Sequence, residues 1–189
     1  MKRKIFYLMV LISVAFIFII GGCASTMMTK VNTLEKPEDD YAMVTFLRPS
    51  SLAFAIKFGI WDSEKLVGIL TANSYIQYKA EPGEHLFMGR SENWSYVKAN
   101  LEAGKNYYII GRLIPGVWKA RVALDPVNTG ENISQSRIDE WLKNLDPTTV
   151  IPEKIDSYVN PRLDQVKIAI EELESGKVKY MVLEADEGR

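Results

Sequence analysis

The sequence predicts a mainly β protein, an antiparallel β-sandwich of about eight strands with a C-terminal helical appendage. Short segments rich in β-branched and aromatic residues recur through residues 41–127, separated by clusters of Pro, Gly, Asp and Ser. No helix-length segment lies between them, which favours antiparallel pairing because a parallel pair needs a long crossover connection. From residue 128 onward, apolar residues follow the three- and four-residue spacing of helices.

Each expected strand of the sandwich combines β-formers with a turn at its end. Pro82-Gly83 suits the central positions of a type II turn, because Gly tolerates a positive φ. Gly104, in another turn, precedes a Tyr-rich segment. The expected strands cover residues 41–48, 53–61, 66–70, 75–80, 85–90, 94–101, 107–112 and 117–124.

The remaining residues, 128–189, are expected to form a helical extension packed on the sandwich. Ser134 or Ser136 caps a first helix that runs to about residue 144. Pro152 suits the first position of a second helix, and Pro161 begins a stretch that continues to a cap at Gly176. Residues 177–184 are expected to form one last strand.

The first 22 residues have the pattern of a secretory signal peptide. Lys2, Arg3 and Lys4 form a positive start, and residues 5–20 are apolar except for Ser13. This apolar run is shorter than the roughly 20 residues that a membrane-spanning helix needs. We therefore predict that residues 1–22 are removed, with an uncleaved membrane anchor as the alternative.

The end of this segment resembles the bacterial lipobox. Ile20, Gly21 and Gly22 supply the branched and small residues that such a signal peptidase recognises, and Cys23 is the only Cys in the chain. The resemblance implies that Cys23 is acylated and becomes the first residue of the mature protein, with membrane lipid as its partner. Residues 23–40 then read as the lipidated Cys and a flexible tether spanning on the order of 20–25 Å. In enterobacteria-like sorting, an Asp directly after the lipidated Cys favours retention in the inner membrane. Ala24 stands at that position, which favours a location in the outer membrane, facing the periplasm, if the organism has one.

Composition excludes several kinds of site. One Cys allows no internal disulfide and no Cys-rich metal site, and one His allows no His-rich metal site. The chain has 23 basic and 24 acidic residues, which gives no electrostatic bias toward nucleic acid. No phosphate-cradling Gly-rich motif is present. We predict no metal, no cofactor and no nucleic-acid partner.

The residues needed for hydrolase chemistry are present only in scattered form. A serine hydrolase needs a His base beside a Ser and a carboxylate, and His85 with Ser91 or Ser95 and Asp62 is the available set. No Gly-x-Ser-x-Gly segment accompanies it. His85 therefore reads as a structural or surface residue. We predict no catalytic residues and no enzymatic activity.

Several segments within residues 42–113 occur in a familiar order and spacing. They are residues 44–49, 59–62, 66–68, the strand around Tyr75, residues 81–85 and residues 101–108. Together they resemble a family of uncharacterised bacterial lipoproteins built on a domain of unknown function, DUF2846. The likeness excludes the helical C-terminal part. It implies a β-sandwich on a lipid anchor and brings no known activity.

The sequence thus predicts an envelope lipoprotein that is a non-enzymatic binding or structural module. An aromatic binding face made by Trp61, Trp94 and Trp118 is one hypothesis for a glycan or envelope-protein partner, although strand aromatics mostly pack in cores. One alternative is an envelope hydrolase acting on cell-wall or lipid substrates. Another is a subunit of an envelope assembly that docks through its C-terminal helices.

Overall fold

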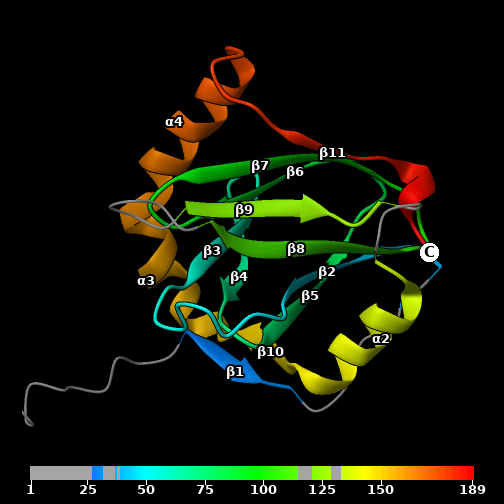
Figure 1. The fold of residues 1–189 in the computed structure, drawn as a ribbon. Coiled ribbons are helices and arrows are strands. Elements are labelled where there is room, and N and C mark those ends of the chain that lie inside the picture. Colours follow the sequence, from blue (N-terminus) through cyan, green and yellow to red (C-terminus); the bar gives the residue numbers. More distant parts are fainter. Residues whose placement is uncertain (1–26, 32–36, 38, 115–120, 129–132) are drawn as a thin grey trace, which may run out of the picture.

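A computed structural model describes residues 27–31, 37, 39–114, 121–128 and 133–189 of the chain. Within these residues the protein is mainly β, with two mixed sheets and helices on their outer faces (Figure 1). The six-stranded sheet has the order β1 (Met28–Lys30), β10 (Asp146–Val150), β5 (Ser74–Ala80), β2 (Ala42–Arg48), β8 (Asn106–Ile114) and β9 (Arg121–Pro126). The five-stranded sheet has the order β11 (Met181–Leu183), β7 (Trp94–Leu101), β6 (Gly83–Arg90), β3 (Phe58–Asp62) and β4 (Lys65–Leu70).

The expected antiparallel sandwich of about eight strands is wrong in strand number and in pairing. Eleven strands form the two sheets of the described residues, and β2–β8, β5–β10 and β7–β11 are parallel pairs. The crossovers between β2 and β8 consist of strands rather than a helix. The chain leaves β2, forms β3 and β4 in the other sheet, returns for β5, and leaves again for β6 and β7.

The core lies between the two sheets. Because strand residues alternate between faces, every second side chain of β2 and β3 points into this layer. Val44, Phe46 and Ile60 are fully buried there, and Phe46 meets Phe87 of β6 edge-on with 5.3 Å between ring centroids. Aromatic contact across the layer therefore ties the two sheets together.

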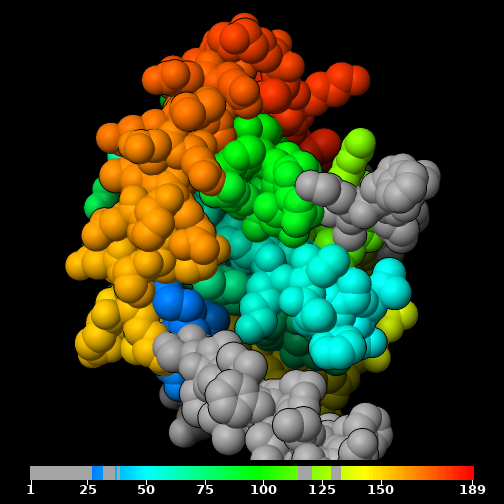
Figure 2. Space-filling view, turned by 90° about the vertical axis from the view of Figure 1, so that its left-hand side faces the viewer, coloured from blue at the N-terminus to red at the C-terminus, as the bar shows by residue number. Residues whose placement is uncertain are grey.

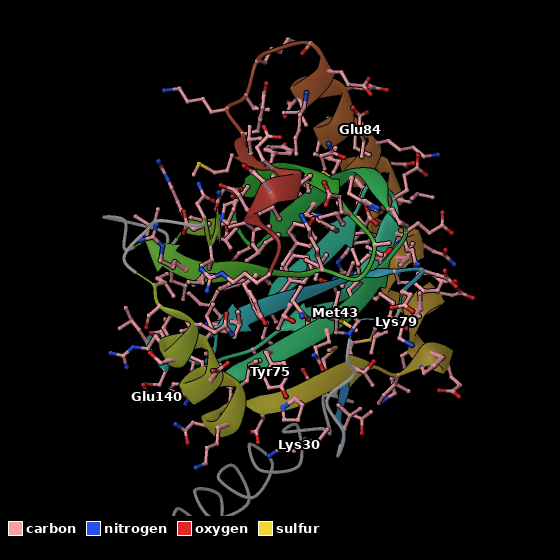
Figure 3. All side chains as sticks on the ribbon, turned by 90° about the vertical axis from the view of Figure 1, so that its right-hand side faces the viewer. Lys30, Met43, Tyr75, Lys79, Glu84 and Glu140 are labelled. Atoms are coloured by element: carbon pink, nitrogen blue, oxygen red, sulfur yellow. The ribbon has the colours of Figure 1, made fainter. Side chains whose placement is uncertain are left out.

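Helix α2 (Gln135–Asn144) covers the outer face of the six-stranded sheet. Ser134, one of the two caps that the sequence predicted, accepts a hydrogen bond from Arg137 N at 3.3 Å. Its buried residue Ile138 packs on Leu47 and on Tyr75 of β5. Figure 3 shows this side of the molecule, with Tyr75 beside the helix that carries Glu140.

A second helical run covers the outer face of the five-stranded sheet (Figure 1). The 3-10 turn η1 (Pro152–Lys154) leads into α3 (Ile155–Val159), and the 3-10 turn η2 (Asn160–Arg162) leads into α4 (Leu163–Glu174). Val166, Ala169 and Leu173 of α4 are buried against the sheet. Among the described residues, no helix is long and apolar enough to cross a membrane.

Both ends of the expected sandwich domain need correction. Residues 23–40 were expected to be a tether, but Met28–Lys30 pairs with β10 at the edge of the six-stranded sheet. Residues 128–189 were expected to be a helical extension with one last strand over residues 177–184; β11 lies within that strand, but the same residues also supply β10, which was not expected. The 3-10 turn η3 (Ala185–Glu187) leads to Arg189, whose backbone exchanges hydrogen bonds of 2.8 and 2.9 Å with Asn106. The C-terminal segment is therefore part of the folded body.

Candidate functional site

The distance along the chain from Cys23 to the folded body is short. Ile20, Gly21, Gly22 and Cys23 lie outside the described residues, and Met28, which begins β1, follows Cys23 by five positions. A fully extended chain covers about 3.3–3.6 Å per residue, so the two Cα atoms are at most about 18 Å apart. A group attached to Cys23 is therefore held close to this edge of the sheet.

Strand β1 is fixed by contacts on both sides. Its backbone pairs with β10, and Ile151 N donates to Met27 O at 2.9 Å. Ile69 N of β4 donates to Met28 Sδ at 3.2 Å. A cavity of about 280 Å³ lies here, lined by Met27, Met28 and Ile69 together with Lys57. Lys57 ends the loop of residues 49–57, so this loop and β1 are neighbours.

Arg48 holds the loop of residues 49–57 in place. The residue is 1% exposed, and its guanidinium donates to Ile56 O at 2.5 Å, to Leu52 O at 3.0 Å and to Ala53 O at 3.1 Å. It also lies 4.6 Å from the centre of the Phe58 ring. Burial lowers the pKa of Arg48, and the carbonyl acceptors offset part of the cost of burying its charge. The loop is thus closed around one buried side chain.

This closed loop exposes two large apolar side chains. Leu52 is 58% exposed and Phe54 is 77% exposed. Ala53 between them has a φ of 49°, in the left-handed region that residues other than Gly seldom occupy. Figure 2 shows the residues around 50–57 in cyan on the same face as β1 in blue. An apolar projection therefore lies on the same face of the molecule as β1.

His85 belongs to a polar network that joins the two sheets. His85 Nδ1 on β6 lies 2.8 Å from Asp62 Oδ2 on β3, and Tyr78 Oη on β5 donates to the same oxygen at 2.9 Å. His85 Nε2 lies 2.7 Å from Glu81 O. Lys65 Nζ donates to Tyr78 Oη at 3.2 Å. The side chains of His85 and Asp62 are only 13% and 11% exposed.

Both ring nitrogens of His85 face oxygen atoms that accept hydrogen bonds. A carbonyl oxygen can only accept, so Nε2 donates to Glu81 O while Nδ1 donates to Asp62. The hydrogen bond to Asp62 raises the pKa of His85 above its ordinary value of 6.5, although burial opposes this change. The arrangement suits an imidazolium ion. It leaves no ring nitrogen to take a proton from Ser91 or Ser95, and Ser95 Oγ accepts a hydrogen bond from Leu124 N at 2.9 Å.

The proposed set of three exposed tryptophans is not formed. Trp61 is fully buried under α3, where Tyr158 stacks on it with 6.2 Å between ring centroids. Trp94 is partly buried in the same cluster, and Trp118 lies outside the described residues. The expectation is therefore wrong for Trp61, because the C-terminal helices cover the sheet face that carries it.

Some features of this face had no clear sequence signal. The sequence placed Arg48 only as the last residue of a strand before Pro49, and its burial was not predicted. The one available signal was the position of a charged residue at the end of an apolar strand. Residues 53–61 read as one strand, but β3 begins only at Phe58. Within the described ranges, no group of three or more His, Cys, Asp or Glu side chains is placed to hold a metal ion.

No protein-family model matches this chain, and no curated protein matches its sequence. The resemblance to the DUF2846 lipoproteins therefore stays a prediction from the residues that carry it.

Proposed function

We propose that this protein is a lipid-anchored bacterial envelope protein whose folded domain lies directly against the membrane and acts as a non-enzymatic binding module. The observation that carries the proposal is the separation of only five positions between Cys23 and the first residue of β1. An acyl group on Cys23 would place β1 within about 18 Å of the lipid. The outer membrane, on its periplasmic side, is the favoured location in an organism that has one.

The loop of residues 49–57 supports this orientation. Leu52 and Phe54 are exposed on the loop that ends at Lys57, and Lys57 and Lys30 line the cavity beside β1. Apolar side chains flanked by Lys suit the boundary between lipid headgroups and acyl chains. The partner proposed for this surface is a lipid bilayer. The acyl chains supply most of the attachment, and the loop fixes which face meets the lipid.

The two alternatives gain less support. The hydrolase hypothesis needs a histidine that is free to act as a base, whereas both nitrogens of His85 are engaged. The assembly hypothesis needs an unoccupied apolar face on the C-terminal helices. Helix α4 instead uses its apolar face, including Leu173, to cover the sheet.

The proposal is tested by comparing wild-type chain with a Cys23→Ser variant expressed in a bacterium that processes lipoproteins. Intact-mass measurement should give a wild-type species that begins at Cys23 and carries the added mass of acyl chains. The variant should carry no such mass. Acyl mass that persists in Cys23→Ser, or wild-type protein without it, would contradict the proposal.

A further inference from the structure

A second cavity, of about 410 Å³, lies between the loop of residues 49–57, the end of β6 and the second helical run. It is lined by Lys57, Arg90, Ser91, Glu92, Tyr158 and Arg162. Three of these residues are cationic and one is acidic, so its lining carries a net positive charge. Lys57 also lines the cavity beside β1, which puts the two cavities next to each other.

Two buried N–H donors near this cavity lack an acceptor. Arg90 Nη1 and Trp61 Nε1 are both buried without a hydrogen-bond partner among the described residues. The guanidinium and the indole nitrogen can donate but cannot accept. Leaving such a donor unpaired costs about 1–3 kcal/mol. Two such groups in one region indicate an acceptor that the protein itself does not supply.

Gly59 links the buried indole to the cavity. A Cβ atom at Gly59 would lie 2.9 Å from Tyr158 Oη and 3.0 Å from Trp61 Nε1. The hydroxyl and the indole nitrogen therefore both border the space that Gly59 leaves empty. Tyr158 lines the cavity and stacks on Trp61, so it connects the two.

Tyr158 shares the cavity with two guanidinium groups, those of Arg90 and Arg162. Arg162 Cζ lies 4.0 Å from the centre of the Tyr158 ring, and Arg162 Nη1 donates to Tyr158 O at 2.9 Å. Burial raises the pKa of Tyr158, while the charges of Arg162 and Arg90 act in the opposite direction. The phenol stays protonated at neutral pH and is a donor beside two cations.

We propose that this cavity binds a phosphate group, with Arg90, Arg162 and Lys57 as the charged donors and Tyr158 and Ser91 as hydroxyl donors. Guanidinium groups bind phosphate oxygens through paired, charge-assisted hydrogen bonds. A phosphate has enough acceptor oxygens to meet several donors that approach from different elements. The phosphate is either free or part of a lipid headgroup, since Lys57 joins this cavity to the face proposed to meet the membrane. Only the second source depends on the lipid anchor.

Calorimetric titration of the purified full chain with inorganic phosphate, at constant ionic strength, tests the site itself. Saturable binding is expected, and Arg162→Gln and Lys57→Gln should each weaken it about tenfold or more, which is the loss of about 1.4 kcal/mol. Tyr158→Phe should weaken it several-fold while keeping the stack on Trp61. Arg137→Gln is the matched control, because Arg137 on α2 is exposed and pairs with Glu140 on the other side of the molecule.

Vesicles distinguish the source of the phosphate. The same proteins are added to phosphatidylcholine vesicles with or without phosphatidic acid, which exposes a phosphomonoester. Binding that requires phosphatidic acid and is lost in Arg162→Gln identifies the headgroup, whereas saturable binding of inorganic phosphate alone identifies the free anion. No saturable binding of either probe, or equal binding by Arg162→Gln and Arg137→Gln, overturns the site. The phosphate titration is repeated with Cys23→Ser, so a failure of the anchor is distinguished from a failure of the site.

Discussion

His85 on β6 and Asp62 on β3 form an ion pair of 2.8 Å within the five-stranded sheet, and Tyr78 of the six-stranded sheet donates a hydrogen bond to the same carboxylate. One carboxylate oxygen thus receives donors from β6 of its own sheet and from β5 of the opposite sheet. The ring of His85 stacks on Phe87, with 5.5 Å between centroids, so the network sits directly over the aromatic core. A change in the charge of His85 should therefore change the stability of the packing between the sheets.

The first prediction concerns the pH dependence of folding. The pKa of His85 is raised in the folded protein, so its contribution to stability is fully present below the unfolded value of 6.5. That contribution is lost as pH rises through the higher folded pKa. Urea unfolding of wild-type protein should show a free energy of unfolding that falls as pH increases above about 6.5.

The matched variant for this measurement is His85→Gln, which has no titrating group at that position. Its free energy of unfolding should be lower in acid and should change less across the same pH range. The nearby groups Asp62, Glu81, Glu84, Lys65 and Tyr78 are retained, so they are common to both proteins. A wild-type slope that persists unchanged in His85→Gln would assign the pH dependence to another group.

The second prediction concerns the loop held by Arg48. Arg48→Lys keeps the positive charge but replaces the planar fork with a single ammonium, which cannot reach three carbonyls in the same geometry. Loss of hydrogen bonds that this buried cation makes to the loop carbonyls should lower the free energy of unfolding by about 2–3 kcal/mol. Denaturant unfolding measures this loss. Arg137→Lys, at an exposed ion pair on α2, should cost less than about 1 kcal/mol. Equal small losses in both variants would show that Arg48 is not a structural support.

The third prediction concerns the contact of the loop with lipid. Cys23 is the only Cys, and its acylation would leave an introduced thiol as the only free one. In vesicles, the thiol of Phe54→Cys should react with a membrane-impermeant maleimide about tenfold more slowly than after unfolding in urea. Removal of the loop from water is the physical reason.

Val182→Cys is the control for that measurement. Val182 on β11 is 43% exposed, and Figure 1 places β11 at the opposite end of the molecule from β1. Its thiol should remain reactive in vesicles. Equal reactivity of the two introduced thiols would mean that the face carrying Phe54 does not meet the membrane.

The sequence predicted those strands that local composition defines. β2, β5, β7 and β8 combine β-formers with clear turns, and their positions are confirmed within a few residues. β1 was missed because three residues at a sheet edge have little signal of their own and depend on pairing with β10. β10 was missed because Asp146-Pro147 reads as a chain break, although Pro is tolerated near the start of a strand. The parallel pairing of β2 with β8 was missed because strands, most of them in the five-stranded sheet, form the connection between them.

The candidate site was less accessible to sequence reasoning than the fold. Arg90 and Arg162 lie far apart in sequence, and only the packing of the second helical run on β3 and β6 brings them to one cavity. The burial of Trp61 follows from the same packing. Alternation within β3 indicates which side chains share a face, but it cannot indicate that a helix more than 90 residues later covers that face.

The last prediction decides whether α4 belongs to the core or serves as a docking element. Leu173 is 4% exposed and packs in the cluster that contains Trp61. Leu173→Ala should lower the free energy of unfolding by about 2–5 kcal/mol, because it removes buried side-chain volume. Ile168→Ala on the same helix should cost within about 0.5 kcal/mol, since Ile168 is 54% exposed. If both variants unfold like the wild type, the apolar face of α4 does not stabilise the domain, and the hypothesis that the C-terminal helices bind a partner becomes the better account.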